Sequence, residues 1–205
     1  MSTWADFYPE LMPSVLGCPY PTADAALRAA AREFLERTRL WREWLDPVTV
    51  LPGVREYSLD LPLDSMVVRI ERCTANGADM PVLSHNAQAS DYTRTEQPEQ
   101  GIVSRDCSTF TLTQAMPAGT HLAAEVSLMP STKAKGLPDG LFFQHYEDIL
   151  AGAKHRLMLI PETSFSNGDL AMFFKNAFES AVATKTVTAW KGATGTTPRP
   201  RVGWV

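Results

Sequence analysis

The cysteines and histidines are the side chains that could supply a nucleophile, a base or a metal site. They are Cys18, Cys73 and Cys107, and His85, His121, His145 and His155. No two cysteines form a Cys-x-x-Cys pair, and no two histidines lie three to five residues apart. Because metal sites in sequence are recognised by closely spaced ligands, this pattern predicts no metal site. It favours free, buried thiols in a reducing compartment.

A cysteine protease-like pair is the most specific catalytic arrangement that the chain offers. Cys107 could act as a nucleophile if His85 or His121 lay within hydrogen-bond range as its base. The alternative is a thiol buried in a β core, which is the commoner role of such a cysteine. Glu147 and Asp148 are adjacent carboxylates, but neighbours on a helix point about 100° apart, so they are predicted not to share a substrate.

No phosphate-binding glycine loop, Gly-x-Ser-x-Gly or Walker motif occurs in the chain. We therefore expect a protein that is not an enzyme and holds no cofactor. A virion-associated hydrolase that uses Glu147, Cys107 or a histidine is the alternative. A free β-sandwich binding module is a second alternative.

Composition limits the other classes of function. The 205 residues are 44% hydrophobic and 20% charged, which is typical of one globular domain or two small ones. The net charge of -4 argues against a protein that grips nucleic acid through its phosphates. No apolar run approaches the roughly 18 residues of a membrane span. The first seven residues lack the basic region and apolar core of a signal peptide, which predicts synthesis in the cytoplasm and no membrane partner.

The first predicted element is a helix over residues 22–46. Apolar side chains recur at helical spacing from Leu27 to Leu45, and Pro47 ends the pattern. On its other faces, Arg32/Glu36 and Arg39/Glu43 are four residues apart and could form ion pairs on a solvated surface.

Residues 47–130 have the pattern of short β-strands. Val48–Leu51 and Val54–Leu59 flank Pro52-Gly53 and predict a hairpin, and the strand from Met66 runs into Asn76-Gly77, a strong turn signal. In residues 121–129, apolar residues alternate with His121, Glu125 and Ser127, which predicts one buried and one solvated face.

Two more helices follow. Asp139 is the expected N-cap of a helix that ends before Pro161, and Asn167 is the expected N-cap of the next. The expected fold class is therefore α+β: a three-helix bundle (22–46 and 131–190) with a small antiparallel β domain (47–130) inserted between its first and second helices. An N-terminal arm (1–21) and an extended C-terminal tail (191–205) complete it.

Both ends contain features of interaction surfaces. Residues 1–21 hold Trp4, Phe7 and Tyr8 among prolines, with no sign that the domain buries them. Residues 180–205 carry a charge of +4 and no acid. Aromatic residues and arginines are the usual anchors of protein interfaces, so both ends favour a component of an assembly.

Several motifs occur in an order that resembles the head-to-tail adaptor (connector) proteins of tailed, especially short-tailed, bacteriophages. They are Ala30-Ala31-Arg32-Glu33-Phe34, Trp41, Gly53-x-x-x-Tyr57, Pro130-Ser131, Leu137-Pro138, Tyr146, Gly152-Ala153, Leu157, Pro161, Phe165-Ser166-Asn167, Ala171 and Phe174-x-x-x-Phe178. They span residues 22–185. Leu35 and Phe165 stand where the family commonly has Cys and Trp.

The resemblance implies a structural virion protein of the phage neck, assembled in the host cytoplasm. Such a protein forms a homo-oligomeric ring, commonly of twelve subunits, that binds the portal protein on one side and the tail tube or nozzle protein on the other. Packaged DNA passes through its bore without sequence-specific binding. An acidic lining would let DNA slide because it repels phosphate, and residues 55–106 sum to -4.

Two sets of interface residues are expected. The candidate portal-docking residues are Lys191, Arg199, Arg201 and Trp204, in a tail that would extend onto the partner. The candidate subunit–subunit packing residues are Phe143, Phe173, Trp4, Phe7 and Tyr8. Phe143 and Phe173 fall off the main apolar face of their helices, so a partner would explain them.

Overall fold

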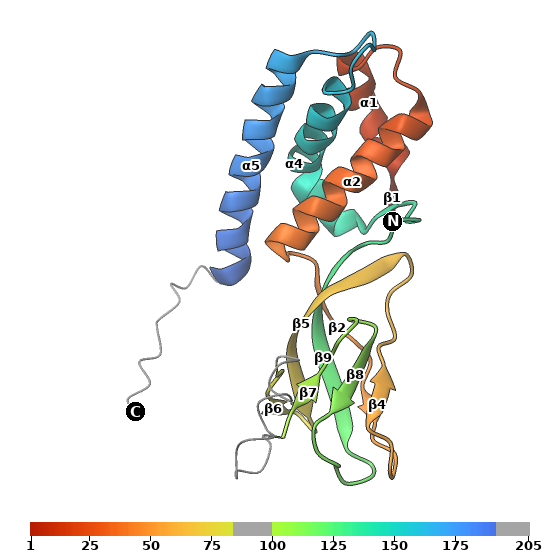
Figure 1. The fold of residues 1–205 in the computed structure, drawn as a ribbon, viewed down its shortest axis with the longest axis vertical. Coiled ribbons are helices and arrows are strands. Elements are labelled where there is room, and N and C mark those ends of the chain that lie inside the picture. The colour runs from red at the N-terminus through yellow and green to blue at the C-terminus, as the bar shows by residue number, and fades with distance from the viewer. Residues whose placement is uncertain (84–99, 192–205) are drawn as a thin grey trace, which may run out of the picture. The chain divides into compact units, whose positions relative to one another are not determined.

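A computed structural model describes residues 1–83 and 100–191, with only the backbone for Trp190 and Lys191. The chain divides into two compact units (Figure 1). The helical unit comprises Met1–Leu40 and the chain from Pro130 onward, and the β unit is Trp41–Met129.

The helical unit contains α1 (Tyr8–Leu11), α2 (Tyr20–Thr38), α4 (Asp139–Met158), α5 (Gly168–Lys191) and the short strand pair β1 (Ser2–Thr3) and β10 (Gly136–Leu137), with 3₁₀ turns at Trp4–Phe7 and Met12–Ser14. Helices α2, α4 and α5 pack against one another (Figure 1). They meet most closely at Gly152 of α4, where a Cβ atom would lie 2.7 Å from the Phe178 ring of α5 and 3.1 Å from Ala30 of α2. Glycine is therefore what lets the three backbones approach.

Helix α2 ends eight residues earlier than the predicted range of 22–46. Arg39 adopts a left-handed conformation with φ of 52°, which terminates the helix after Thr38. The chain then becomes strand β2 (Arg42–Trp44), and just after it Leu45 N–H donates to Ala124 O at 2.9 Å. Glu43 is therefore not on the helix, so the expected Arg39/Glu43 helical pair is wrong, and its carboxylate instead accepts from Trp41 Nε1.

The expected N-terminal arm is also wrong, because residues 1–21 fold onto the helices. Trp4 is 3% exposed and donates from Nε1 to Ala134 O at 2.8 Å. The Phe7 ring is fully buried and stacks on Tyr146 with 4.9 Å between centroids. The interpretation that these aromatic residues lack a place within the domain was therefore incorrect for Trp4 and Phe7.

The two late helices begin differently. Asn167 Oδ1 accepts from Leu170 N–H at 3.1 Å, so the predicted N-cap of α5 is confirmed. Asp139 does not cap α4, because it is the first residue of the helix. Its carboxylate instead accepts from the N-terminal amine and from Ser2 Oγ, and these bonds lower its pKa.

The β unit contains β2 (Arg42–Trp44), β3 (Val48–Thr49), β4 (Glu56–Ser58), β5 (Ser65–Ala75), β6 (Ala78–Met80), β7 (Ile102–Val103), β8 (Thr109–Leu112) and β9 (His121–Pro130). One sheet has the order β2-β9-β5-β6, with β3 also paired to β9, and the other has the order β4-β8-β7. Asn76 and Gly77 have φ of 49° and 81° and join β5 to β6, so the predicted tight turn is confirmed.

Two β-sheet predictions are wrong. Strands β3 and β4 do not pair as a hairpin, because β3 pairs with β9 and β4 with β8 in separate sheets. Ser127 was expected on a solvated face but is 0% exposed. The Ser127 hydroxyl donates a hydrogen bond to Glu71 Oε1 at 3.0 Å, so this buried polar group has a partner.

The expected fold class therefore needs correction. Within the described residues the protein is α+β, with four α-helices and ten strands in three sheets. It is not a three-helix bundle with a small inserted β domain. The pairings that overturn this expectation are long-range in sequence, such as β1 with β10, and local periodicity does not report them.

Candidate assembly surface

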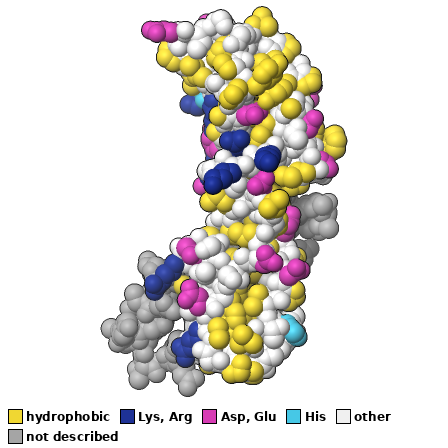
Figure 2. All heavy atoms as spheres, turned by 90° about the vertical axis from the view of Figure 1, so that its right-hand side faces the viewer, with side chains coloured by type: hydrophobic (Ala, Val, Ile, Leu, Met, Phe, Trp, Pro, Cys, Tyr) yellow, Lys and Arg dark blue, Asp and Glu magenta, His cyan; other side chains and the backbone are white. Residues whose placement is uncertain are grey.

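Helices α4 and α5 expose large apolar side chains. Phe143 is 76% exposed and Phe173 is 64% exposed. Phe143 follows the buried Phe142, and Phe173 precedes the half-buried Phe174. Because neighbouring residues on a helix point about 100° apart, Phe143 and Phe173 point away from the packed face. Three more exposed side chains lie on α5, and Leu159 lies just after the end of α4; the three are Leu170, Met172 and Val187. Figure 2 shows the side of the helical unit that faces away from α5, and this side carries hydrophobic side chains at its surface as well.

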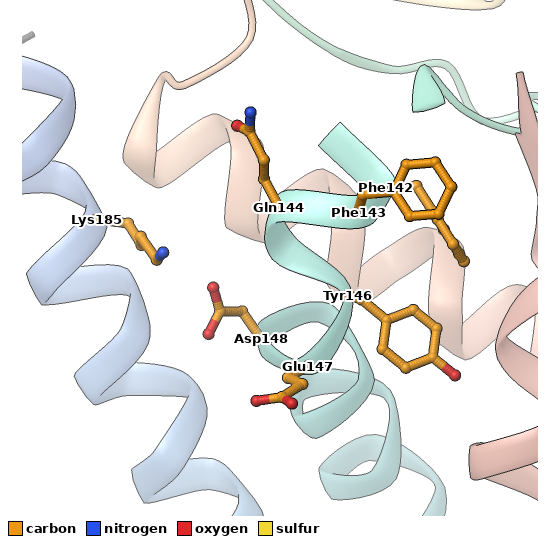
Figure 3. Close-up of a pocket in the computed structure, with 7 residues that line it drawn as sticks. All are labelled: Phe142, Phe143, Gln144, Tyr146, Glu147, Asp148 and Lys185. Carbon is orange, nitrogen blue, oxygen red and sulfur yellow. The ribbon is translucent and has the colours of Figure 1, made fainter. Parts of the chain in front are cut away.

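An acidic groove of about 410 Å³ lies along the first half of α4 (Figure 3). Its lining is Phe142, Phe143, Gln144, Tyr146, Glu147, Asp148 and, from α5, Lys185. In Figure 3 the side chains of Asp148 and Lys185 point toward one another. Glu147 and Asp148 both line this open groove, and their predicted inability to share one substrate stays a prediction.

A break in helical geometry lies in α4 between residues that line this groove, at the buried His145. His145 has φ of -129° and ψ of 17°, and its ring is buried beside Phe34 with 5.2 Å between centroids. Its Nδ1 lies 3.6 Å from Asp148 Oδ2 and has no hydrogen-bond partner within residues 1–83 and 100–191. The break separates the turn that carries Phe143 from the turn that carries Glu147.

An arginine groove of about 510 Å³ lies on α2. Its lining is Ala25, Arg28, Ala29, Arg32, Glu33, Glu36, Thr132 and Arg156. Arg28 Nε donates to Ala134 O at 3.1 Å, and Arg32 Nη1 donates to Pro130 O at 3.2 Å. Both guanidinium groups are thereby held against the segment that follows β9. Between them, Ala25 and Ala29 are exposed and present only methyl groups.

Ion pairs connect the three long helices beside this groove. Arg37 of α2 donates to Glu33 at 3.0 Å and to Glu179 of α5 at 2.6 Å, and Arg156 of α4 donates to Glu33. Hydrogen bonding to Glu179 raises the pKa of Arg37, and the same bond lowers the pKa of Glu179. The charged residues of α2 were expected to lie on a solvated face. Glu33 in addition forms ion pairs with Arg37 and with Arg156 of α4.

The proposed nucleophile Cys107 lies in the β unit. Its Sγ is 3.8 Å from Val68 O, and burial, with the nearby Asp106 charge, raises the pKa of the thiol. His121 Nδ1 is 3.2 Å from Thr49 Oγ1, and His85 lies outside the described residues. Burial also raises the pKa of Cys18, and raises that of Cys73 to about 11. All three thiols therefore favour the protonated form, which is the weaker nucleophile.

Neither a metal-binding cluster nor a membrane-spanning helix is found in the described part of the chain. It holds no group of three or more His, Cys, Asp or Glu side chains arranged to bind a metal ion. It also holds no helix that is long and apolar enough to cross a membrane.

The remaining residues that were predicted to form interfaces lie near the N-terminus and the C-terminus of the chain. Tyr8 is half-buried, and its hydroxyl donates to Asp24 at 2.5 Å; burial and this bond raise its pKa to about 12. Lys191 is the last residue of α5. Arg199, Arg201 and Trp204 lie outside the described residues.

Sequence reasoning missed the arginine groove. Its signal is present, because Ala25 and Ala29 are four residues apart and so are Arg28 and Arg32. Together they form a stripe of small side chains bordered by cations. No family model matches the chain, and no curated protein matches its sequence.

Proposed function

We propose that this protein is the head-to-tail adaptor of a tailed bacteriophage, a ring of copies, expected to number twelve, that joins the portal protein to the tail and lets DNA pass. The observation that carries the proposal is the exposure of Phe143, Phe173 and three further large apolar side chains on α4 and α5, with Leu159 just after α4. A surface of this kind favours a partner protein. The motif order that resembles phage adaptors indicates which kind of assembly.

The energetics support an assembly role. Fully burying a phenylalanine side chain contributes about 1.5–3 kcal/mol relative to exposure. Phe143 and Phe173 retain most of that potential, since they are 76% and 64% exposed. Covering them would contribute about 1–2 kcal/mol each, once for every subunit of a closed ring.

The motifs that resemble those of phage adaptors lie at packing contacts and at a helix end, which is compatible with the proposal. Gly152 and Phe178, from two different motifs, contact each other where α4 and α5 approach. Asn167 of a third motif caps α5. The motifs thus maintain the helical unit whose outer surface would form the ring, and none of them requires a catalytic role.

DNA passage is compatible with the charge of the chain. The net charge is -4, and residues 55–106 account for the same sum. Repulsion between a carboxylate-rich surface and phosphate would keep DNA from adhering to the bore.

The test uses the full chain and the portal protein encoded by the same genome. Portal rings incubated with the chain should acquire an added ring, visible by electron microscopy, with a fixed subunit ratio by native mass spectrometry. A folded chain that never binds portal rings would contradict the proposal. If that chain instead hydrolyses a cell-wall polymer or an ester, the hydrolase alternative replaces it.

The expected docking arm provides a second test. Deleting residues 195–205, which lie outside the described residues, should leave a soluble subunit with unchanged helical content by circular dichroism. In the proposed assembly this subunit no longer binds portals, because Arg199, Arg201 and Trp204 are its anchors. Normal portal binding by the truncated chain would refute the docking-arm claim.

A further inference from the structure

We propose that neighbouring copies of this chain join head to tail, with Phe143 and Glu147 of one copy seated in the arginine groove of the next. The inference rests on the proposed ring, and it names the two surfaces that would close it. A ring requires a heterologous contact, in which two different surfaces of each subunit complement one another. The helical unit carries two such surfaces.

The two grooves are separate and share no lining residue. The acidic groove is lined by the first half of α4 and by Lys185 of α5. The arginine groove is lined mainly by α2, together with Thr132 and Arg156. One copy can therefore use both grooves at once, with a different neighbour at each.

The shapes are complementary. Phe143 projects at the edge of the acidic groove, and Ala25 and Ala29 leave a depression in α2 where larger side chains would stand. An aromatic ring buries a large area with few rotatable bonds, so it is an efficient knob for such a depression. The cations that border the depression can also lie against the face of the ring.

The charges are complementary as well. Two carboxylates, Glu147 and Asp148, line the acidic groove beside a single lysine, Lys185. Three arginines line the other groove beside Glu33 and Glu36, so cations exceed carboxylates by one there. Glu33 pairs with Arg156, one of the three, and with Arg37. Glu147 follows Phe143 by four residues, so a carboxylate accompanies the knob into the cationic border.

Arg28 is positioned to receive that carboxylate. Its bond from Nε to Ala134 O fixes the guanidinium against the groove. A guanidinium has five N–H donors and binds carboxylates through two parallel hydrogen bonds. Such pairs set orientation and partner choice at interfaces more than they add affinity. We therefore expect Arg28 and Glu147 to determine which surfaces meet.

Charge reversal tests the contact. Glu147→Arg and Arg28→Glu should each reduce the fraction of portal-bound subunits at least tenfold, with unchanged circular dichroism. An equimolar mixture of the two variants should restore assembly, because each contact between unlike copies then has opposite charges. Glu162→Arg, in the exposed loop outside both grooves, is the matched control and should assemble normally.

A covalent readout does not depend on the portal. The variant Gln144→Cys/Ala29→Cys, which keeps Phe143 and Glu147, should form a ladder of disulfide-linked multimers on mild oxidation, whereas either single variant should stop at dimers. Glu162→Cys/Ala29→Cys is the control and should give no ladder, because Glu162 lies outside both grooves.

The outcomes separate the two proposals. Normal ring assembly by both reversal variants, or a mixture that fails to recover, would overturn the head-to-tail contact while leaving the adaptor function intact. Loss of binding only to a tail protein would likewise overturn it, because the grooves would then serve that partner. If the double-cysteine variant forms the ladder while the wild-type chain ignores portals, the contact is supported and the adaptor function is contradicted.

Discussion

Substituting Gly152 by alanine should destabilise the helical unit, although alanine is the better helix former. The added Cβ would lie 2.7 Å from the Phe178 ring, closer than real Cβ contacts allow, and 3.1 Å from the Ala30 side chain. Phe178 is itself buried, with Phe34 6.1 Å away and the Arg156 guanidinium 5.8 Å from its ring, so it has little room to move.

The magnitude follows from two opposing contributions. Overpacking a core costs about 2 kcal/mol. Replacing glycine by alanine within a helix returns about 1 kcal/mol. We expect Gly152→Ala to lower the free energy of unfolding by about 1 kcal/mol in net terms. Gly140→Ala is the matched control on the same helix, because nothing lies within 4 Å of its Cβ position, and it should be neutral or stabilising.

Denaturant unfolding followed by far-ultraviolet circular dichroism measures both variants. Phe178→Leu in the Gly152→Ala background should recover part of the loss, since it removes ring atoms from the crowded contact. The coupling between the two substitutions should be at least 0.5 kcal/mol, as is typical of residues in contact. If Gly152→Ala were as stable as Gly140→Ala, the close approach of the three helices would be refuted.

Further predictions concern the exposed rings, an ion pair and a thiol. Phe143→Ala and Phe173→Ala should change monomer stability by no more than about 0.5 kcal/mol and impair portal assembly; a loss of ~3 kcal/mol with normal assembly would make them core residues. Glu179 has a lowered pKa in the fold because Arg37 donates to it, so its contribution to stability is present above the unfolded pKa and is lost as the pH falls through the folded pKa. Glu179→Gln should therefore flatten the acid side of the stability profile measured by urea titration across pH, and an unchanged profile would show that the pair contributes nothing. Cys107→Ala should cost at most about 1 kcal/mol and leave infectivity intact, whereas loss of infectivity in a folded variant would favour the hydrolase alternative.

Local signals in the sequence predicted the elements that depend on neighbouring residues. Asn167 caps α5 because its side chain reaches an amide three residues away. Asn76-Gly77 turns the chain between β5 and β6 because both residues tolerate positive φ. The exposed positions of Phe143 and Phe173 could likewise be inferred, since each lies one residue away from a packed face on a helix.

Where two local patterns compete, the sequence misled. Trp41 and Leu45 continue the apolar spacing of α2, yet both are buried in the β unit. After the left-handed turn at Arg39 the chain leaves the helix direction. The backbone hydrogen bonds of residues 42–44 are then made to strand β9. The N-terminal aromatic residues similarly show no periodicity, and only contact with α4 reveals that they are core.

The two grooves of the candidate site were harder to predict from the sequence than the helices that carry them. The sequence by itself determined that α2 carries alternating alanines and arginines and that α4 carries Phe143 and Glu147 four residues apart. Tertiary packing decided that one set lines a groove held by the carbonyls of Ala134 and Pro130, and that the other lines a groove with Lys185 of α5. Spacing along a helix fixes which side chains share its face, but the partner that borders that face comes from residues about 40 to 100 positions away, and only the folded chain brings them together.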